Sequence, residues 1–90
     1  MTIHLPKTEV EYYASAKPRT RKVVGYWDDD GTLHRGPFFK AMLGAKGVGY
    51  AHGTYIPKAG LYASRSCALQ GAKMFQDRMR EKLAAGDYTD

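Results

Sequence analysis

Cysteine and long apolar runs are what this sequence has least of. Cys67 is the only cysteine among the 90 residues, so no disulfide can form within the chain. A fold without disulfides suits a reducing compartment, and we expect a cytoplasmic protein. No apolar run approaches the roughly 18 residues of a membrane-spanning helix. The N-terminal segment also lacks the basic stretch and apolar run of a signal peptide, so we expect no membrane partner.

Patterns typical of enzymes and metal centres are also missing. The three histidines are far apart in the sequence and Cys67 has no second thiol near it, which argues against a zinc site. The aspartates at 28–30 precede a glycine as in a calcium loop, but the position that needs a bidentate acid holds Phe39. Nothing supplies an orienting partner for a Cys-His nucleophile pair. We therefore expect no catalytic residue, no metal and no cofactor.

Positive charge is in excess. Lys and Arg number 14 against 9 acids, which gives a net charge of +5. Four basic residues lie close together just before Tyr26 and Trp27: Lys17, Arg19, Arg21 and Lys22. Basic groups next to aromatic rings can contact phosphates and stack on bases. The other interpretation is a solvated linker, with the two aromatic side chains in the core.

One long amphipathic helix is predicted over residues 64–85. Ser64 is a suitable N-cap, and Gly86 stands where a left-handed C-cap residue is expected. Apolar residues recur at steps of four, three, four and four, which places them on one helical face: Ala68, Ala72, Phe75, Met79 and Leu83. This face is expected to close the core.

A β-hairpin is predicted ahead of this helix. Residues 21–27 are β-branched and aromatic, Asp30-Gly31 suits a tight turn, and residues 32–35 return as the partner strand. Gly36-Pro37 is expected to end the pairing. Strand alternation sets Lys22, Val24 and Tyr26 on one face and Arg21, Val23 and Trp27 on the other.

The remaining segments give weaker patterns. Residues 9–14 alternate as a short edge strand would, and residues 38–43 fit either a helical turn or an extended apolar patch. Residues 47–56 alternate bulky side chains with small ones, which predicts a strand with a bare face. Three small residues form that face, and the helix is expected to pack on it through Ala68 and Ala72: Gly49, Ala51 and Gly53.

Together these elements predict an α+β fold. A small antiparallel sheet of three or four strands packs against one long C-terminal amphipathic helix at about residues 64–85. Ninety residues are too few to divide between two cores, so the whole chain, 1–90, is expected to form a single domain. Residues 1–8, an N-terminal arm, and the tail at 87–90 are expected to be flexible.

The order of strand, hairpin, strand and C-terminal helix resembles the modules of plant ethylene-response factors and of integrase arm-binding domains. The resemblance covers residues 20–86 and rests on element order and on the Ala-rich helix sequence YASRSCALQGAKMF. It implies a sheet laid in the major groove of DNA. A stand-alone chain of this size is also similar to accessory proteins of phages and mobile elements, including anti-CRISPR inhibitors.

These patterns favour a non-enzymatic binding protein that engages nucleic acid or a nucleoprotein complex. Residues 44–47 also have the G-x-x-G spacing of a nucleic-acid clamp, although a plain hairpin connection explains them too. The alternative is a protein-binding inhibitor that blocks an acidic site on a host enzyme, which the seven tyrosines support. The candidate binding residues are Lys17, Arg19, Arg21, Lys22, Tyr26, Arg35, Lys46, Arg65 and Lys73.

Overall fold

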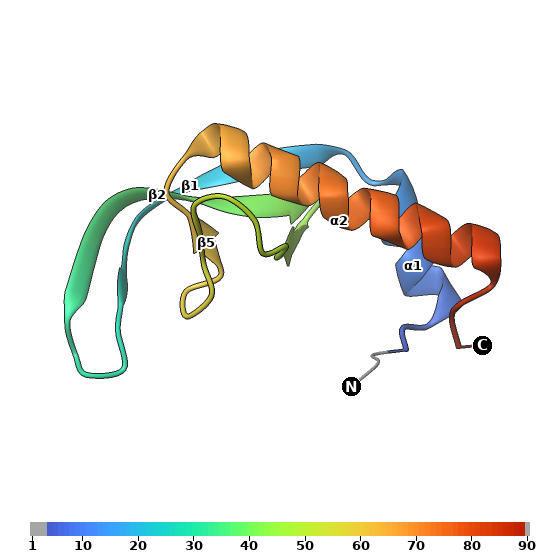
Figure 1. Cartoon of the computed structure of the whole chain (residues 1–90), viewed down its shortest axis with the longest axis horizontal. Helices are drawn as coiled ribbons and strands as arrows, with labels where there is room; N and C mark the ends of the chain where they lie inside the picture. Colours follow the sequence, from blue (N-terminus) through green and yellow to red (C-terminus); the bar gives the residue numbers. More distant parts are fainter. Residues whose placement is uncertain (1–3, 90) are drawn as a thin grey trace.

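The structure, a computed structural model, describes residues 4–89. An antiparallel sheet packs against a long C-terminal helix, and a short N-terminal helix packs against the same long helix (Figure 1). This arrangement confirms the predicted α+β class. The sheet has five strands where three or four were predicted, and three of the five are only two or three residues long. In chain order the elements are α1 Lys7–Ser15, β1 Pro18–Trp27, β2 Leu33–Leu43, β3 Lys46–Val48, β4 Tyr55–Ile56, β5 Leu61–Tyr62 and α2 Arg65–Ala85.

β2 is the central strand of the sheet. The strand order is β1-β2-β5-β4, and β3 also pairs with β2. β1 is therefore an outermost strand, and β2 is its only strand partner among residues 4–89. Gly36-Pro37 interrupts the regular pairing, as predicted, since neither residue has a partner in β1, but it does not end it. β2 continues through this pair, and the register shifts by one residue between Val23 and Gly25.

α2 forms as predicted. The Ser64 hydroxyl accepts a hydrogen bond from the backbone N–H of Cys67 at 3.2 Å, and Gly86 ends the helix in the left-handed conformation at φ 70°. Three residues of the predicted apolar face are buried and the other two pack against the core: Ala68, Ala72 and Met79, then Phe75 and Leu83. The caps and the apolar stripe were sufficient to predict this element.

α1 replaces the edge strand predicted over residues 9–14. Val10, Tyr13 and Ala14 are buried at helical spacing, and α1 packs on α2 through them. The buried side-chain amide of Gln76 on α2 donates to the backbone oxygens of Tyr13 at 3.0 Å and Ala16 at 2.6 Å. Packing against α2 therefore overrides the weak alternation of the local sequence.

The two ends of the described chain are hydrogen-bonded to each other. The N–H of Lys7 donates to the carbonyl of Thr89 at 2.8 Å, and the N–H of Thr89 donates to the carbonyl of Leu5 at 2.9 Å. The predicted arm, 1–8, thus contains the start of α1 at Lys7, while residues 1–3 and 90 lie outside the described residues.

The long strand predicted over residues 47–56 does not form. β3 ends at Val48, and Tyr62 then bonds the backbone of Tyr50: its hydroxyl accepts from the N–H at 3.0 Å and donates to the carbonyl at 2.5 Å. A side chain thus takes the bonds that a strand partner would make. The small residues Gly49, Ala51 and Gly53 are exposed, and Ala68 and Ala72 lie in the core cluster instead, so the predicted packing of these alanines on them is wrong.

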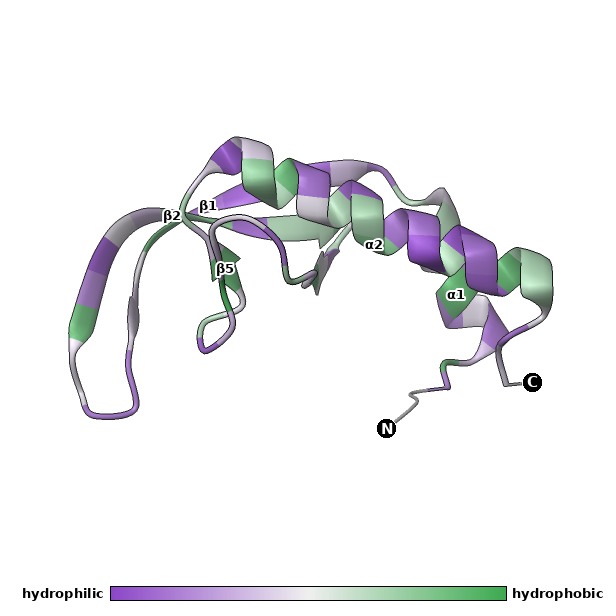
Figure 2. Cartoon of the chain, in the orientation of Figure 1, coloured by the Kyte–Doolittle hydropathy of each residue, from purple (hydrophilic) through white to green (hydrophobic). Residues whose placement is uncertain are grey.

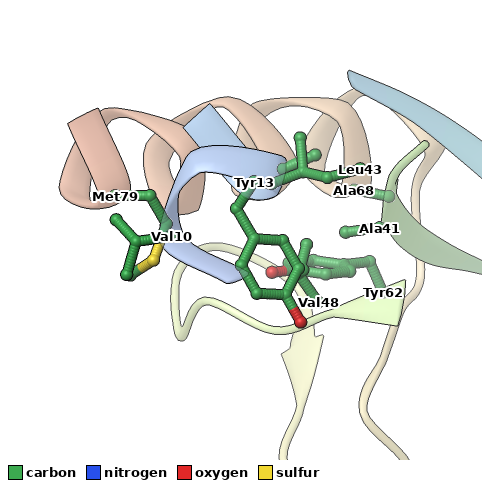
Figure 3. Close-up of a cluster of buried hydrophobic side chains, with 9 residues drawn as sticks. Val10, Tyr13, Ala41, Leu43, Val48, Tyr62, Ala68 and Met79 are labelled. Atoms are coloured by element: carbon green, nitrogen blue, oxygen red, sulfur yellow. The ribbon is translucent and has the colours of Figure 1, made fainter. Parts of the chain in front are cut away.

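The core lies between α2, α1 and the inner face of the sheet (Figure 3). Leu43 and Tyr62 are fully buried there, together with Val10 from α1. Gly71 of α2 lies directly against the Tyr62 hydroxyl, and a Cβ at this position would overlap that oxygen. The helix therefore approaches the sheet closely at Gly71, while the loop approaches its first turn where Gly53 lies against the Cys67 sulfur.

The end of the β1–β2 ribbon leaves this core. We call residues 23–38 the projecting hairpin and the rest of the described chain the body. Figure 1 shows the hairpin extending past the start of α2, and the molecule measures 42 × 25 × 21 Å. Figure 2 shows hydrophilic and hydrophobic segments alternating along the projecting hairpin. Among residues 4–89, neither helix offers an apolar stretch that could span a bilayer.

Candidate functional site

Three basic side chains share the sheet face that points away from α2. The register sets Arg21 opposite Lys40, and residues opposite each other share one face. Ala41 lies in the core beneath α2 and Phe39 packs against it, so Lys40, between these two residues, points the other way. Arg19, two residues before Arg21, lies on the same face. We call these three residues, Arg19, Arg21 and Lys40, the basic face.

No acid neutralises the basic face within the described residues. All three residues are exposed. None of their side chains has a carboxylate within 4.0 Å among residues 4–89. The guanidinium of Arg19 donates to the carbonyl of Gly44 at 2.6 Å, which holds it at the sheet surface. Like charges directly opposite each other destabilise a sheet. The pair of Arg21 and Lys40 therefore has no stabilising role in the isolated chain.

Three aromatic rings continue this face into the projecting hairpin. Tyr26 stacks on His34 with ring centroids 4.7 Å apart and an angle of 9°, and it meets Phe38 edge-on at 5.2 Å. Phe38 lies two residues from Lys40, on the same side of β2. The prediction that Tyr26 shares a face with Lys22 is wrong, because the register shift after Val23 reverses the alternation. We call Tyr26, His34 and Phe38 the aromatic cluster.

Trp27 lies on the opposite face of the hairpin and is 70% exposed. The register pairs it with Leu33, which is 38% exposed, and pairs Gly25 with Arg35 two residues away. Trp27 is thus not a core residue, whereas Tyr26 is half-buried. A shallow depression of about 360 Å³ lies beside this surface and is lined by Lys22, Val24, Arg35, Gly36 and Pro37.

The turn of the projecting hairpin, residues 28–30, is acidic. A hydrogen bond from the following backbone N–H, and then one from His34 at 3.1 Å, hold the pKa of Asp28 below its ordinary value. Hydrogen bonds from Thr32 lower the pKa of Asp30 in the same way. Lys58, in the turn between β4 and β5, approaches Asp28 at 3.9 Å. Asp28 and Asp30 are therefore charged at neutral pH.

Two predicted binding residues make side-chain contacts with other residues of the chain. The ammonium of Lys46 lies 3.8 Å from the carboxylate of Glu9 and 5.2 Å from the ring centre of Tyr12. The guanidinium of Arg65 covers the ring of Phe39 at 5.1 Å. Residues 44–47 form the tight connection between β2 and β3, as the plain interpretation of this segment predicts.

The other predicted residues are exposed but dispersed. Lys22 pairs with Phe39 and therefore lies on the α2 side of the sheet, as does Arg35 through its position opposite Gly25. Lys17 precedes β1, and Lys73 lies on the outer surface of α2. Of the nine candidates, only Arg19 and Arg21 belong to the basic face and only Tyr26 to the aromatic cluster.

Lys40 was missed by the sequence analysis. Residues 38–43 fitted a helical turn as well as a strand, so the face of Lys40 could not be assigned. The signal that could have found it is the alternation of Lys40 with Phe39 and Ala41, once the segment is taken as a strand.

Cys67 has an unusual environment but no catalytic partner. Hydrogen bonds from Ser64, and then from Thr54, lower the pKa of the Cys67 thiol to about 7. The ring of His52 is bonded to the backbone oxygen of Cys67 at 2.9 Å, not to its sulfur. Within residues 4–89, no three His, Cys, Asp or Glu side chains gather closely enough to hold a metal ion. Within the described residues, Cys67 thus combines a lowered thiol pKa with no hydrogen bond between its sulfur and a histidine ring.

Comparison of the chain with protein-family models, with curated proteins and with solved structures finds no match. The likeness to the sheet-and-helix modules thus rests on element order and on the Ala-rich helix sequence. The additional helix α1 and the strands β3 to β5 extend that order.

Proposed function

We propose that this protein binds nucleic acid through the basic face, without catalysis. The observation that carries the proposal is the placement of Arg21 opposite Lys40, with Arg19 beside them and no acidic partner in the described chain. The Lys40 side chain extends over Gly47 of β3, so its ammonium and Arg21 border the same face from two strands. Like charges opposite each other are unfavourable in a sheet, and an anion against this face would offset that cost. A chain of phosphates supplies such an anion and releases counterions on binding.

The aromatic cluster supports the same ligand. It continues the basic face along the hairpin, so phosphates and bases of one bound strand could be contacted by neighbouring groups. The net charge of +5 adds long-range attraction to a polyanion. An acidic protein would also neutralise the basic face, but it has no bases to stack on the rings of the aromatic cluster.

A salt titration tests this function. Binding of a labelled oligonucleotide is measured against salt concentration for the wild type, Arg21→Ala, Lys40→Ala and the matched control Lys73→Ala, whose lysine is exposed on α2. Each lost phosphate contact should flatten the plot of log affinity against log salt by about 0.7 for single strands and about 0.9 for duplex. Equal slopes for Arg21→Ala and Lys73→Ala, or no binding at low salt, would refute the proposal.

A protein-binding inhibitor is the second candidate function. Exposed Trp27 and Leu33 next to the acidic turn have the apolar centre and polar rim of a protein interface. Affinity capture from a nuclease-treated lysate tests it, with Trp27→Ala as the control bait. A stoichiometric protein retained by the wild type and lost with Trp27→Ala would favour this candidate.

A further inference from the structure

The exposed apolar residues of the chain are concentrated on the projecting hairpin. Val24 is 86% exposed, Trp27 70% and Leu33 38%, whereas the body contributes only Tyr12, at 36%, among the described residues. Single exposed apolar residues are common on any protein surface, but three on one short ribbon form a patch. Such a patch indicates a surface that is covered when the protein is bound.

Positive charge surrounds this patch on the side of the body. Arg35 lies two cross-strand pairs from Trp27 and on the same face, and Lys22 lines the same depression as Arg35 and Val24. An aromatic face next to cations is the arrangement with which proteins bind unpaired bases, since the base stacks and its phosphate meets the cation. The charge of the patch thus complements a nucleic-acid strand.

The acidic turn disfavours a duplex. Lowered pKa values keep Asp28 and Asp30 charged at neutral pH. A hairpin inserted into a groove would place these carboxylates between two rows of phosphates, where like charges repel. This argues against the groove docking that the resemblance to sheet-and-helix modules implies.

The positions of the two surfaces also favour a flexible ligand. The basic face and Trp27 lie on opposite faces of the β1–β2 ribbon, and β1 is an outermost strand. A single strand can cross the free edge of β1 and contact both surfaces. Duplex DNA is stiff over about 150 base pairs and cannot bend around a ribbon of this size.

We infer that the ligand of this protein is single-stranded nucleic acid, which runs from the basic face across the edge of β1 and stacks a base on Trp27. This inference rests on the proposed function. It adds the strandedness of the ligand and a role for Trp27, neither of which the basic face requires.

Trp27 is the only tryptophan in the chain, so its fluorescence reports this contact directly. The wild type is titrated with oligo(dT), oligo(U) and a DNA duplex of equal length at low salt. We expect both single strands to quench Trp27 and to bind more tightly than the duplex.

Variants separate stacking from charge. In anisotropy titrations with labelled oligo(dT), Trp27→Ala should bind about tenfold or more weakly, and Trp27→Phe should retain part of the lost affinity. The salt dependence of binding should stay unchanged, because no phosphate contact is removed. Gln70→Ala, an uncharged exposed change on α2 outside both surfaces, serves as the control and should bind as the wild type does.

The possible failures are distinct. Duplex binding as tight as single-strand binding, or an unchanged affinity of Trp27→Ala, overturns the inference and leaves the proposed function standing. No binding of any of the three nucleic acids overturns both. Capture of a protein that depends on Trp27, with no quenching by oligo(dT), assigns the patch to a protein partner and also overturns the inference.

Discussion

The body and the projecting hairpin differ in what their apolar residues do. In the body Leu43 and Tyr62 are completely buried, and the Tyr62 hydroxyl is bonded on both its donor and acceptor sides. In the hairpin Trp27 and Val24 face solvent, and the aromatic cluster is only half-buried. Apolar composition is similar along the chain, so it is burial that distinguishes the part that maintains the fold from the part free to bind.

The largest expected effect compares the same substitution in the two regions. Leu43→Ala should lower the free energy of unfolding by about 2–5 kcal/mol, because Leu43 is fully buried and its loss leaves a cavity. Leu33→Ala, at a position 38% exposed, should change it by less than about 1 kcal/mol. Urea unfolding of both variants measures the difference. Equal losses would mean that the hairpin is part of the core.

Gly71→Ala probes the close contact inside the body. Alanine normally stabilises a helix relative to glycine by about 1 kcal/mol. Here the added methyl group would overlap the Tyr62 hydroxyl, so we expect a net loss of about 1–3 kcal/mol. The same change in a Tyr62→Phe background should cost less, because the overlapping oxygen is gone. A double-mutant cycle from thermal unfolding gives this coupling, and simple additivity would contradict it.

Lys40→Glu should have opposite effects on stability and binding. Replacing a repulsive pair with an attractive one opposite Arg21 should raise the free energy of unfolding by about 0.2–1 kcal/mol, while nucleic-acid affinity falls. Lys40→Gln, which only removes the repulsion, should fall between the two in stability. A destabilised Lys40→Glu variant would show that Lys40 supports the fold and would remove the basis of the proposed site.

The smallest effect concerns Cys67, at the start of α2 on the body side. With its thiol pKa lowered to about 7, the rate of alkylation by iodoacetamide should reach half its maximum near pH 7, because the thiolate is the reacting form. Ser64→Ala removes the largest cause of the shift and should move this midpoint upward. A midpoint near 8.5, the value of a free cysteine, would contradict the prediction.

The sequence was informative where short-range signals agree with the packing. Ser64, Gly86 and the apolar stripe between them predicted α2, and the Asp30-Gly31 turn predicted the hairpin, with Gly31 at φ 85°. α1 was missed because its alternating residues obscured the helical spacing of Val10 and Tyr13, which only α2 makes decisive.

The candidate site was only partly predictable for a related reason. Arg19 and Arg21 were identified from their local charge. The opposition of Arg21 and Lys40, which turns single charges into a shared surface, depends on a register between distant segments. The side of the ribbon on which Tyr26 lies depends on the shift after Val23, and local alternation does not encode it.

The outermost position of β1 gives its basic residues a second consequence, for solubility. An unpaired strand edge can associate with the edge of another molecule, and charges, proline and bulges oppose such aggregation. β1 has all three, in Pro18, Arg19, Arg21 and the register shift after Val23. The same side chains that we assign to ligand binding thus also act as gatekeepers of the sheet, and neutralising several of them at once should make the chain prone to form edge-to-edge aggregates.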